Sequence, residues 1–398
     1  QMRLRVRWQI VGCVQVVAIA LGAAALGLDL KPKIDPLARP LLEDGTVVGM
    51  VVGIVKGGET QVIAYGETAK GSNVAPNADT VYEIGSISKA FTGVLLADAV
   101  ERGIVKLDDP VQKYLPDGVK MPVADEKPIT LEHLATHTSG LPRLPDNMKP
   151  ADPTNPYADY TEAQMYAFLG GHELRCPPGE HEYSNYGMGL LGQVLARRMG
   201  KTYEQCIVEQ IAGPLGMRDT CITLNEDQQK RLAPPYTAAL EKSRTWDFPA
   251  LAGAGGIRST AGDMIKFIQA NLADDDKPLA RALRQAHEKH HTMENGLAMA
   301  LGWHVARDGI TRWHNGMTGG YHGWLSVVPS HNLGVVMLAN TASIRLTQFG
   351  ESVTRVAFGI DVKPPKRRKE VDVDDAVLEG YAGVYTLTPQ VALMVTVE

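Results

Sequence analysis

The chain has 398 residues, of which 44% are hydrophobic and 21% charged, and its formal net charge is -5. This composition excludes a chain that is mainly disordered, and the small negative charge argues against a protein that binds nucleic acid over a basic surface. The 40 glycines and 24 prolines follow no short repeat, which excludes collagen-like and solenoid architectures.

Residues 1–29 have the pattern of an export signal. Arg3, Arg5 and Arg7 precede an apolar run from Ile10 to Leu28, which is typical of a signal peptide. The run is also long enough to span a bilayer, so an uncleaved N-terminal membrane anchor is the alternative. Both interpretations predict that the rest of the chain is exported, either periplasmic or secreted.

Residues 30–360 form the predicted body, with strands at both ends and helices between them. Val47–Val55 and Gln61–Tyr65 flank Gly57-Gly58 and predict a hairpin. Strand patterns return at Gly323–Val328 and Leu333–Leu338. We therefore expect an α/β (α+β) fold, in which one antiparallel sheet from about 45–70 and 300–345 is flanked by helices and carries an inserted helical lobe at about 95–290.

Three further segments have helical signals or charged, proline-rich composition. Thr161 to Gln164 and Thr260 to Asp263 predict helix N-termini, and Ile344 to Phe358 predicts a helix that covers the sheet. Residues 361–377 are interpreted as a charged linker, because prolines and clustered charges gain nothing by burial. Residues 378–398 begin an alternating strand pattern and are interpreted as the start of a β-rich C-terminal module that is incomplete.

Two motifs suggest cofactor chemistry that the surrounding sequence does not support. His287 to His291 fits H-E-x-x-H, but no third ligand follows, so we interpret it as a solvent-facing helix end and expect no metal. Gly187 to Gly192 fits G-x-G-x-x-G, but no strand precedes it, so we interpret these glycines as allowing close helix packing. No cofactor is therefore expected.

The cysteines leave two alternatives open. Beyond Cys13 they are Cys176, Cys206 and Cys221, without C-x-x-C spacing, which argues against a zinc ribbon or a redox pair. One disulfide with a free thiol and three free thiols both remain compatible with the sequence.

The pattern Ser86-Ile87-Ser88-Lys89 is the strongest catalytic signal. It stands at the head of an apolar run, Ala90 to Val100, and on a helix the first serine and the lysine share a face. A serine hydroxyl needs a neighbouring base to become a nucleophile, and a lysine acts as one when burial or positive charge lowers its pKa. The spacing pairs Lys89 with Ser86 rather than with Ser88.

Two further elements complete a candidate active site. Tyr183-Ser184-Asn185 precedes an apolar helix, where a phenol can relay a proton and an amide can orient both the lysine and the substrate. His314-Asn315-Gly316 lies just before the late strands, and the N–H of Met317 could complete an oxyanion hole with that of Ser86.

These elements make the sequence resemble the serine β-lactamase and penicillin-binding superfamily, with the class C β-lactamases most similar. Tyr82 to Leu115 resembles the nucleophile region of class C enzymes over its whole length. Further matching stretches are ITLEHLATHTSGLP, PPGEHEYSNYGMGLLG, GPLGMRDT and GGIRSTAGDM, which together span about Val47 to Phe358. The resemblance implies a sheet domain with an all-helical domain.

The resemblance also implies the roles of the site residues. Ser86 is then the acylated nucleophile, Lys89 and Tyr183 share the general base and acid work, and Asn185 holds the substrate amide. His314, Asn315 and Gly316 occupy the substrate-binding motif in which class C enzymes have Lys-Thr-Gly. A histidine with a pKa near 6.5 would carry charge only in acid, so we expect hydrolysis of carboxylate-bearing substrates to favour mildly acidic pH.

The predicted protein is a monomeric serine acyl hydrolase that acts through a covalent acyl-enzyme on a small-molecule substrate. The favoured reactions are β-lactam hydrolysis and DD-peptidase-like amide hydrolysis. The alternatives are a carboxylesterase or D-amino-acid peptidase of the β-lactamase-like type, and a penicillin-binding sensor that is acylated without turnover. No nucleic-acid partner is expected.

Overall fold

The computed structural model describes residues 28–364, 373–388 and 391–396. The predicted export signal lies outside the described residues except for positions 28 and 29, and so does the centre of the predicted linker, 365–372. Among the residues that are described, no helix is both long and apolar enough to cross a bilayer.

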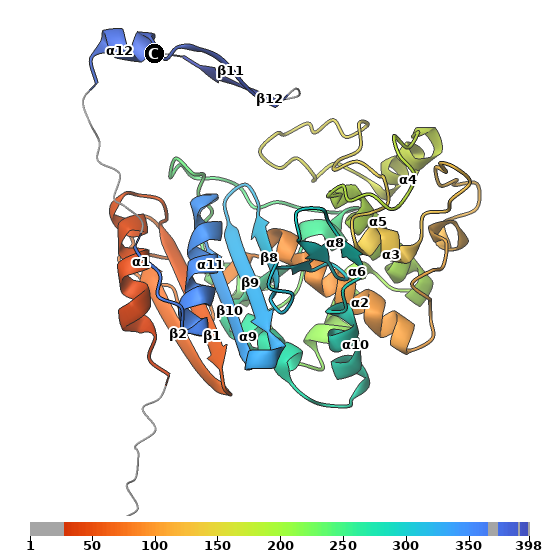
Figure 1. The fold of residues 1–398 in the computed structure, drawn as a ribbon, viewed down its shortest axis with the longest axis horizontal. Helices are drawn as coiled ribbons and strands as arrows, with labels where there is room; N and C mark the ends of the chain where they lie inside the picture. The colour runs from red at the N-terminus through yellow and green to blue at the C-terminus, as the bar shows by residue number, and fades with distance from the viewer. Residues whose placement is uncertain (1–27, 365–372, 389–390, 397–398) are drawn as a thin grey trace, which may run out of the picture.

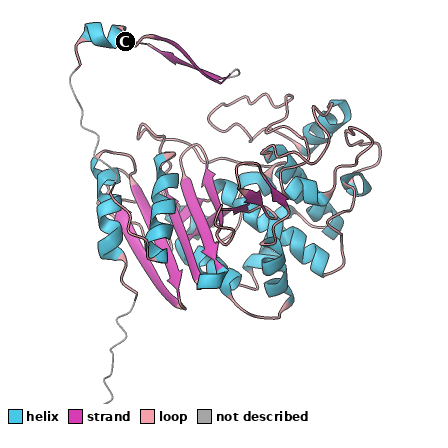
Figure 2. Cartoon of the chain, in the orientation of Figure 1, coloured by secondary structure: helices cyan, strands magenta, loops and turns pink. Residues whose placement is uncertain are grey.

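An eight-stranded antiparallel sheet forms the centre of the body, in the order β2-β1-β10-β9-β8-β7-β6-β5 (Figures 1 and 2). Met50 of β1 pairs with Ala339 of β10, so the two ends of the body meet in one sheet, as the sequence predicts. Its strands are β1 Gly49–Lys56, β2 Glu59–Gly66, β5 His291–Thr292, β6 Ala298–Met299, β7 His304–Val305, β8 Arg312–Met317, β9 His322–Val328 and β10 Leu333–Ala339.

Both faces of this sheet are covered, which explains why its central strands are apolar runs rather than alternating ones. Helices α1 (Lys31–Glu43) and α11 (Arg345–Phe358) pack on one face, around a core that includes Trp324 and Met337. Helix α9 (Ala261–Leu272) packs on the other face against β1 and β10. The second core continues from there into the helical lobe.

The helical lobe lies beside the sheet and is organised around α2 (Figure 1). Thr161 and Gln164 form the predicted capping box of α4, and Thr260 caps α9 as predicted. The remaining helices are α2 Ser88–Glu101, α3 Leu131–Ala135, α4 Glu162–Gly171, α5 Asn185–Met199, α6 Tyr203–Ile207, α7 Glu226–Arg231, α8 Ala252–Gly255, α10 Pro278–Ala286 and α12 Asp375–Glu379.

Short elements connect these layers. A 3₁₀ turn, η1 (Gly85–Ile87), leads into α2, and β3 (Val81–Glu83) pairs with β4 (Arg258–Thr260) immediately before it. The other short helices are η2 Val111–Tyr114, η3 Val208–Ala212 and η4 Pro329–His331. Residues 378–398, where the sequence predicts strands, contain the hairpin of β11 (Gly383–Thr388) and β12 (Val391–Val395).

The two cofactor-like motifs have structural roles. A Cβ on Gly189 would lie 2.4 Å from Leu251, and one on Gly192 would lie 3.1 Å from Gly253, so these glycines let α5 pack closely on α8 as predicted.

The interpretation of H-E-x-x-H as a solvent-facing helix end was wrong for its first residue. Helix α10 ends at Ala286, and the imidazole of His287 is buried edge-on against Trp303.

The three cysteines that the structure describes, Cys176, Cys206 and Cys221, carry free thiols. Of the two alternatives that the sequence left open, the structure therefore shows three thiols. Burial raises the pKa of each of them, which disfavours the reactive thiolate form.

Candidate active site

Ser86 lies in the η1 turn directly before α2, where the chain passes from β3 into the helical lobe. The Nζ atom of Lys89 lies 2.9 Å from Ser86 Oγ and donates a second hydrogen bond to the carbonyl of Ala254 at 2.6 Å. Ser88 has a different role, because its Oγ accepts the N–H of Ile257 at 3.1 Å. Ser86 thus faces Lys89, whereas Ser88 links the start of α2 to the backbone just before β4.

Lys89 is fully buried, and this burial determines its protonation. Burial lowers the pKa of Lys89 well below its usual value, and the nearby positive charge of Arg143 lowers it further. A neutral amine can accept a proton from a hydroxyl group 2.9 Å away. The structure therefore places a base beside Ser86.

Tyr183 lies beside the same lysine. Its ring centroid is 5.0 Å from Lys89 Nζ. Burial raises the pKa of Tyr183 to about 12, although the neighbouring Ser86 hydroxyl and the charge of Arg143 oppose the increase. The phenol therefore stays protonated at neutral pH and can serve as a proton donor.

His137 supports Tyr183 from behind. The two rings lie 4.4 Å apart, and His137 Nδ1 accepts the backbone N–H of Ser184 at 3.1 Å. His137 is buried and has a positive φ of 58°, a conformation that costs energy outside glycine and is held here by the surrounding contacts. We infer that this imidazole positions the tyrosine.

Asn185 begins α5 beside these groups. Its Nδ2 atom donates to the hydroxyl of Tyr157 at 3.2 Å, while its Oδ1 atom is buried without a hydrogen-bond partner in the described part of the chain. A buried unpaired oxygen is costly, and a substrate N–H could satisfy it. The expectation that Asn185 also orients Lys89 is not met, because Nζ of Lys89 bonds to Ser86 and to the Ala254 carbonyl instead.

Strand β8 closes the site against the η1 turn by direct backbone contact. A Cβ on Gly316 would lie 1.9 Å from the carbonyl oxygen of Ile84 and 2.9 Å from the backbone nitrogen of Ser86. A Cβ on Gly85, whose φ is +52°, would lie 2.7 Å from the backbone nitrogen of Met317. Only glycine permits this approach.

The same contact brings together the two predicted oxyanion donors. The backbone N–H of Thr318 donates to the carbonyl of Tyr321 across the β8–β9 turn at 3.1 Å. In an antiparallel pair of strands, residue pairs with and without mutual hydrogen bonds alternate. The next pair, Met317 and His322, is therefore one without them. The N–H of Met317 consequently points away from β9, toward the turn that carries Ser86. Both N–H groups can converge on an oxygen held between strand and turn.

His314 lies at this site, but it does not carry the predicted charge. Its side chain is 1% exposed, and burial lowers its pKa well below the usual value near 6.5. Its Nδ1 atom donates to the carbonyl of Asn315 at 2.6 Å, which leaves Nε2 as a buried acceptor. The expectation that a protonated His314 favours hydrolysis in mild acid was therefore based on a wrong pKa.

Asn315 does not face the site. Its Nδ2 atom donates to Thr347 Oγ1 of α11 at 3.1 Å, on the face of the sheet opposite to His314. Successive side chains of a strand point to opposite faces, so the prediction of a substrate-binding side chain at this position is corrected.

Several residues of the site had no role in the sequence analysis: His137, Tyr157, Arg143 and the carbonyl of Ala254. His137 and the stretch before Arg143 lie in ITLEHLATHTSGLP, which carried the resemblance without an assigned chemistry. A backbone carbonyl gives no sequence signal, so Ala254 could be found only in three dimensions.

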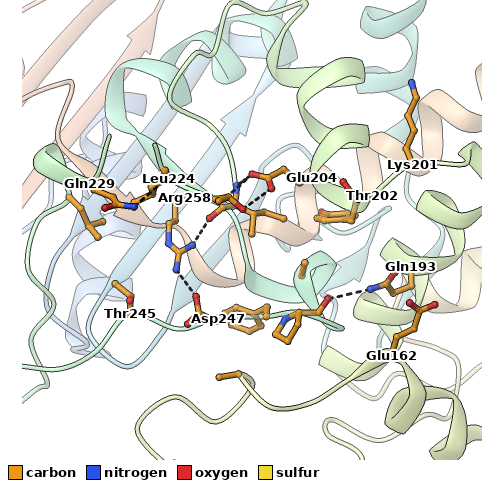
Figure 3. A pocket seen from close by; sticks show the side chains of 18 residues that line it. Glu162, Gln193, Lys201, Thr202, Glu204, Leu224, Gln229, Thr245, Asp247 and Arg258 are labelled. Carbon is orange, nitrogen blue, oxygen red and sulfur yellow. Dashed lines mark hydrogen bonds and ion pairs between the residues drawn. The ribbon is translucent and has the colours of Figure 1, made fainter. Parts of the chain in front are cut away.

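A separate cavity of about 990 Å³ lies between α5, α6 and α8 (Figure 3). Gln193, Glu204 and Arg258 line it, but Ser86, Lys89 and Tyr183 do not. Ala252 of α8 lines this cavity, whereas Ala254 of the same short helix accepts the hydrogen bond of Lys89. Helix α8 therefore lies between this cavity and the catalytic residues, and the cavity is not the catalytic site.

Comparisons with known proteins show the family to which the chain belongs. The β-lactamase family model matches residues 34–349. The chain is 33% identical to the D-alanyl-D-alanine-carboxypeptidase/endopeptidase AmpH of Escherichia coli K12, over 79% of this chain and 85% of that protein. It is 28% identical to a β-lactamase of Pseudomonas fluorescens, over 78% and 94% of the two chains.

A solved structure is similar in fold over almost its whole length. The β-lactamase/D-alanine carboxypeptidase of Yersinia pestis superposes with a TM-score of 0.72 at 30% identity, covering 83% of this chain and 98% of that one. A class C β-lactamase superposes with a TM-score of 0.73 at 24% identity, which supports the fold alone.

Proposed function

Because this chain belongs to the serine β-lactamase and penicillin-binding superfamily and is a serine acyl hydrolase, we propose that it is a DD-carboxypeptidase of the class C β-lactamase type that also opens β-lactams. The similarity to AmpH and to the Yersinia pestis structure supports this substrate class. The observation that carries the proposal is the geometry around the nucleophile: Lys89 Nζ lies 2.9 Å from Ser86 Oγ and 5.0 Å from the ring centroid of Tyr183. Burial shifts the pKa values of Lys89 and Tyr183 in opposite directions.

The opposite shifts divide the acid and base work. Two titratable groups whose pKa values are pushed apart act as base and acid, respectively. Lys89, neutral by burial, takes the proton of Ser86 Oγ as this oxygen attacks the substrate carbonyl. The negative charge that develops on the carbonyl oxygen is stabilised by the N–H groups of Ser86 and Met317.

Collapse of the tetrahedral intermediate needs a proton on the leaving nitrogen. Tyr183, still protonated because its pKa is about 12, supplies this proton as the C–N bond breaks. The proton held by Lys89 then passes to the phenolate of Tyr183, whose ring centroid lies 5.0 Å from Lys89 Nζ. An ester of Ser86 remains, and the leaving group is a D-alanine or the opened ring nitrogen of a β-lactam.

Hydrolysis of the ester repeats the same steps with water. Lys89 accepts a proton from the attacking water, and Tyr183 donates one to Ser86 Oγ as the acyl bond breaks. The proton held by Lys89 then restores the phenol. Nε2 of His314 is buried near this site with no hydrogen-bond partner among the residues that the structure describes, and its ring lies 6.3 Å from that of Tyr183. A neutral imidazole of this kind can orient a water molecule.

The test is intact-mass spectrometry together with product analysis. Wild type, Ser86→Ala and Ser88→Ala are mixed with a cephalosporin and, separately, with an N-acylated D-Ala-D-Ala peptide. We expect wild type and Ser88→Ala to gain a transient acyl mass and to release D-alanine over many turnovers, whereas Ser86→Ala does neither. A wild type without adduct or product would overturn the proposed substrate class.

A further inference from the structure

The site needs a positive charge that its sequence motif does not supply. A D-alanine leaving group ends in a carboxylate, and a carboxylate that enters a partly buried cleft is costly unless a cation meets it. Burial keeps the pKa values of both Lys89 and His314 low, so neither residue offers a stable charge at neutral pH.

Other cations around the site are already engaged. Arg258 pairs with Glu83 and Asp247. Arg312 donates to the carbonyls of His287 and Gly309.

Arg143 is different, because its exposed side chain lies over the catalytic tyrosine. Its guanidinium carbon is 5.1 Å from the ring centroid of Tyr183. Its charge also lowers the pKa values of Lys89 and Tyr157, so it acts on three groups of the site at once. None of the ion pairs found among the described residues includes Arg143.

The backbone holds Arg143 in place relative to the catalytic groups. Its carbonyl accepts the N–H groups of Asn185 and Tyr186 at 3.0 and 3.2 Å. Ser184 Oγ donates to the carbonyl of Pro142 at 2.7 Å. The segment with the guanidinium is therefore tied to the segment with the phenol.

We propose that Arg143 binds the carboxylate of the leaving group and determines the preference of the enzyme for substrates that end in a free carboxylate. In D-alanine the carboxyl carbon lies only about 2.5 Å from the nitrogen that must be protonated. Tyr183 delivers that proton, so a cation beside Tyr183 is beside the carboxylate too. The planar guanidinium can donate to both carboxylate oxygens in a bidentate pair.

The inference deepens the proposed function and rests on it, so its test uses substrates that differ only in charge. An N-acylated D-Ala-D-Ala peptide is compared with the same peptide ending in D-alaninamide. In Arg143→Gln we expect kcat/KM for the acid to fall roughly 10- to 100-fold, the range for a lost charge-assisted hydrogen bond, while the amide changes by less than about 3-fold. Arg143→Lys should lie between the two, because a lysine keeps the charge and loses the bidentate geometry.

The ratio of the two substrates separates recognition from other effects of the arginine. Loss of Arg143 also removes a charge that lowers the pKa of Lys89, but this affects acid and amide alike. Arg175→Gln, at another exposed arginine of the same lobe, is the matched control and should leave the ratio unchanged.

Equal losses on acid and amide, or no loss on either, would overturn the role of Arg143. If wild type hydrolyses neither peptide, the proposed substrate class fails, and the same variants are measured on 3-acetoxybenzoate and phenyl acetate. These esters differ only in a carboxylate on the leaving group. Arg143→Gln must then lower turnover of the first selectively, and an equal effect on both would overturn the inference independently.

Discussion

The two faces of strand β8 differ in what they hold. On one face, Gly316 lies against the backbone of the η1 turn and His314 is buried at the catalytic site. On the other face, Trp313 stacks on Trp324 at 5.2 Å, and Asn315 bonds to Thr347 of α11. On the first face the backbone of β8 lies so close to the backbone of η1 that there is no room for a Cβ on Gly316. On the second face the strand is held by contacts between side chains.

This difference indicates how substitutions should act on the strand. A side chain added to the first face must move the strand away from the nucleophile, so it should affect catalysis. A side chain removed from the second face leaves the backbone where it is and should affect mainly the free energy of unfolding. Three predictions test this division.

The largest expected effect is on the catalytic face. In Gly316→Ala the new Cβ would lie 1.9 Å from the Ile84 carbonyl oxygen, so β8 must shift from η1 and the N–H of Met317 must leave the oxyanion position. Loss of one such donor typically lowers the rate by about 100- to 1,000-fold. The acylation rate with a cephalosporin, measured by stopped-flow absorbance, should fall by at least about 100-fold.

A second variant removes the donor itself. Met317→Pro removes the N–H itself, and since this N–H points away from β9, no bond of that strand pair is lost. Gly170→Ala, where a Cβ meets no atom within 4 Å, is the control. Acylation within a few-fold of wild type in both β8 variants would exclude Met317 from the oxyanion site.

The sequence predicted the parts of this site that depend on local spacing. Ser86 and Lys89 are three residues apart at the start of a helix, and local geometry alone brings them to 2.9 Å. The sheet from both chain ends, the helical middle and the cap of α4 at Thr161 likewise follow from periodicity and capping chemistry.

The remaining parts depend on contacts that the sequence does not reveal. The charge of His314 is set by burial between the strand and the helical lobe, and the orientation of Asn315 is set by which face of β8 meets that lobe. Arg143 reaches Tyr183 because its carbonyl is bound to the N-terminus of α5. Each of these requires the tertiary packing of segments that are far apart in the sequence.

The second prediction concerns a histidine on the α11 side. His322 is 1% exposed and hydrogen-bonded to Thr347, and burial lowers its pKa to about 4. In the unfolded chain this histidine has a pKa near 6.5, so below that pH it binds a proton that the folded chain does not bind. The contribution of His322 to the unfolding free energy is therefore fully present above about pH 6.5 and is lost as the pH falls toward 4. From pH 7 to pH 5 this residue should cost about 2 kcal/mol of unfolding free energy.

Urea unfolding at pH 7 and pH 5 measures this loss. In His322→Asn the decrease between the two pH values should be smaller than in wild type by about 2 kcal/mol, because one titrating group has been removed. His331→Asn, at an exposed histidine, should keep the wild-type decrease. An identical decrease in all three proteins would show that the pKa of His322 is the same in the folded and the unfolded chain.

The smallest expected effect is at Asn315, which lies on the second face of β8 between His314 and Gly316 on the first face. Asn315→Ala removes one hydrogen bond to Thr347 and should lower the unfolding free energy by about 1 kcal/mol. Steady-state kinetics with a carboxylate-bearing cephalosporin should give KM and kcat within about two-fold of wild type, because no interaction with the substrate is lost. Thr347→Val removes the same bond from its other end, so the double variant should be less destabilised than the sum of the two. If instead KM rose in Asn315→Ala and not in Thr347→Val, the asparagine would reach the substrate, and β8 would have to turn this side chain toward the site when the substrate binds.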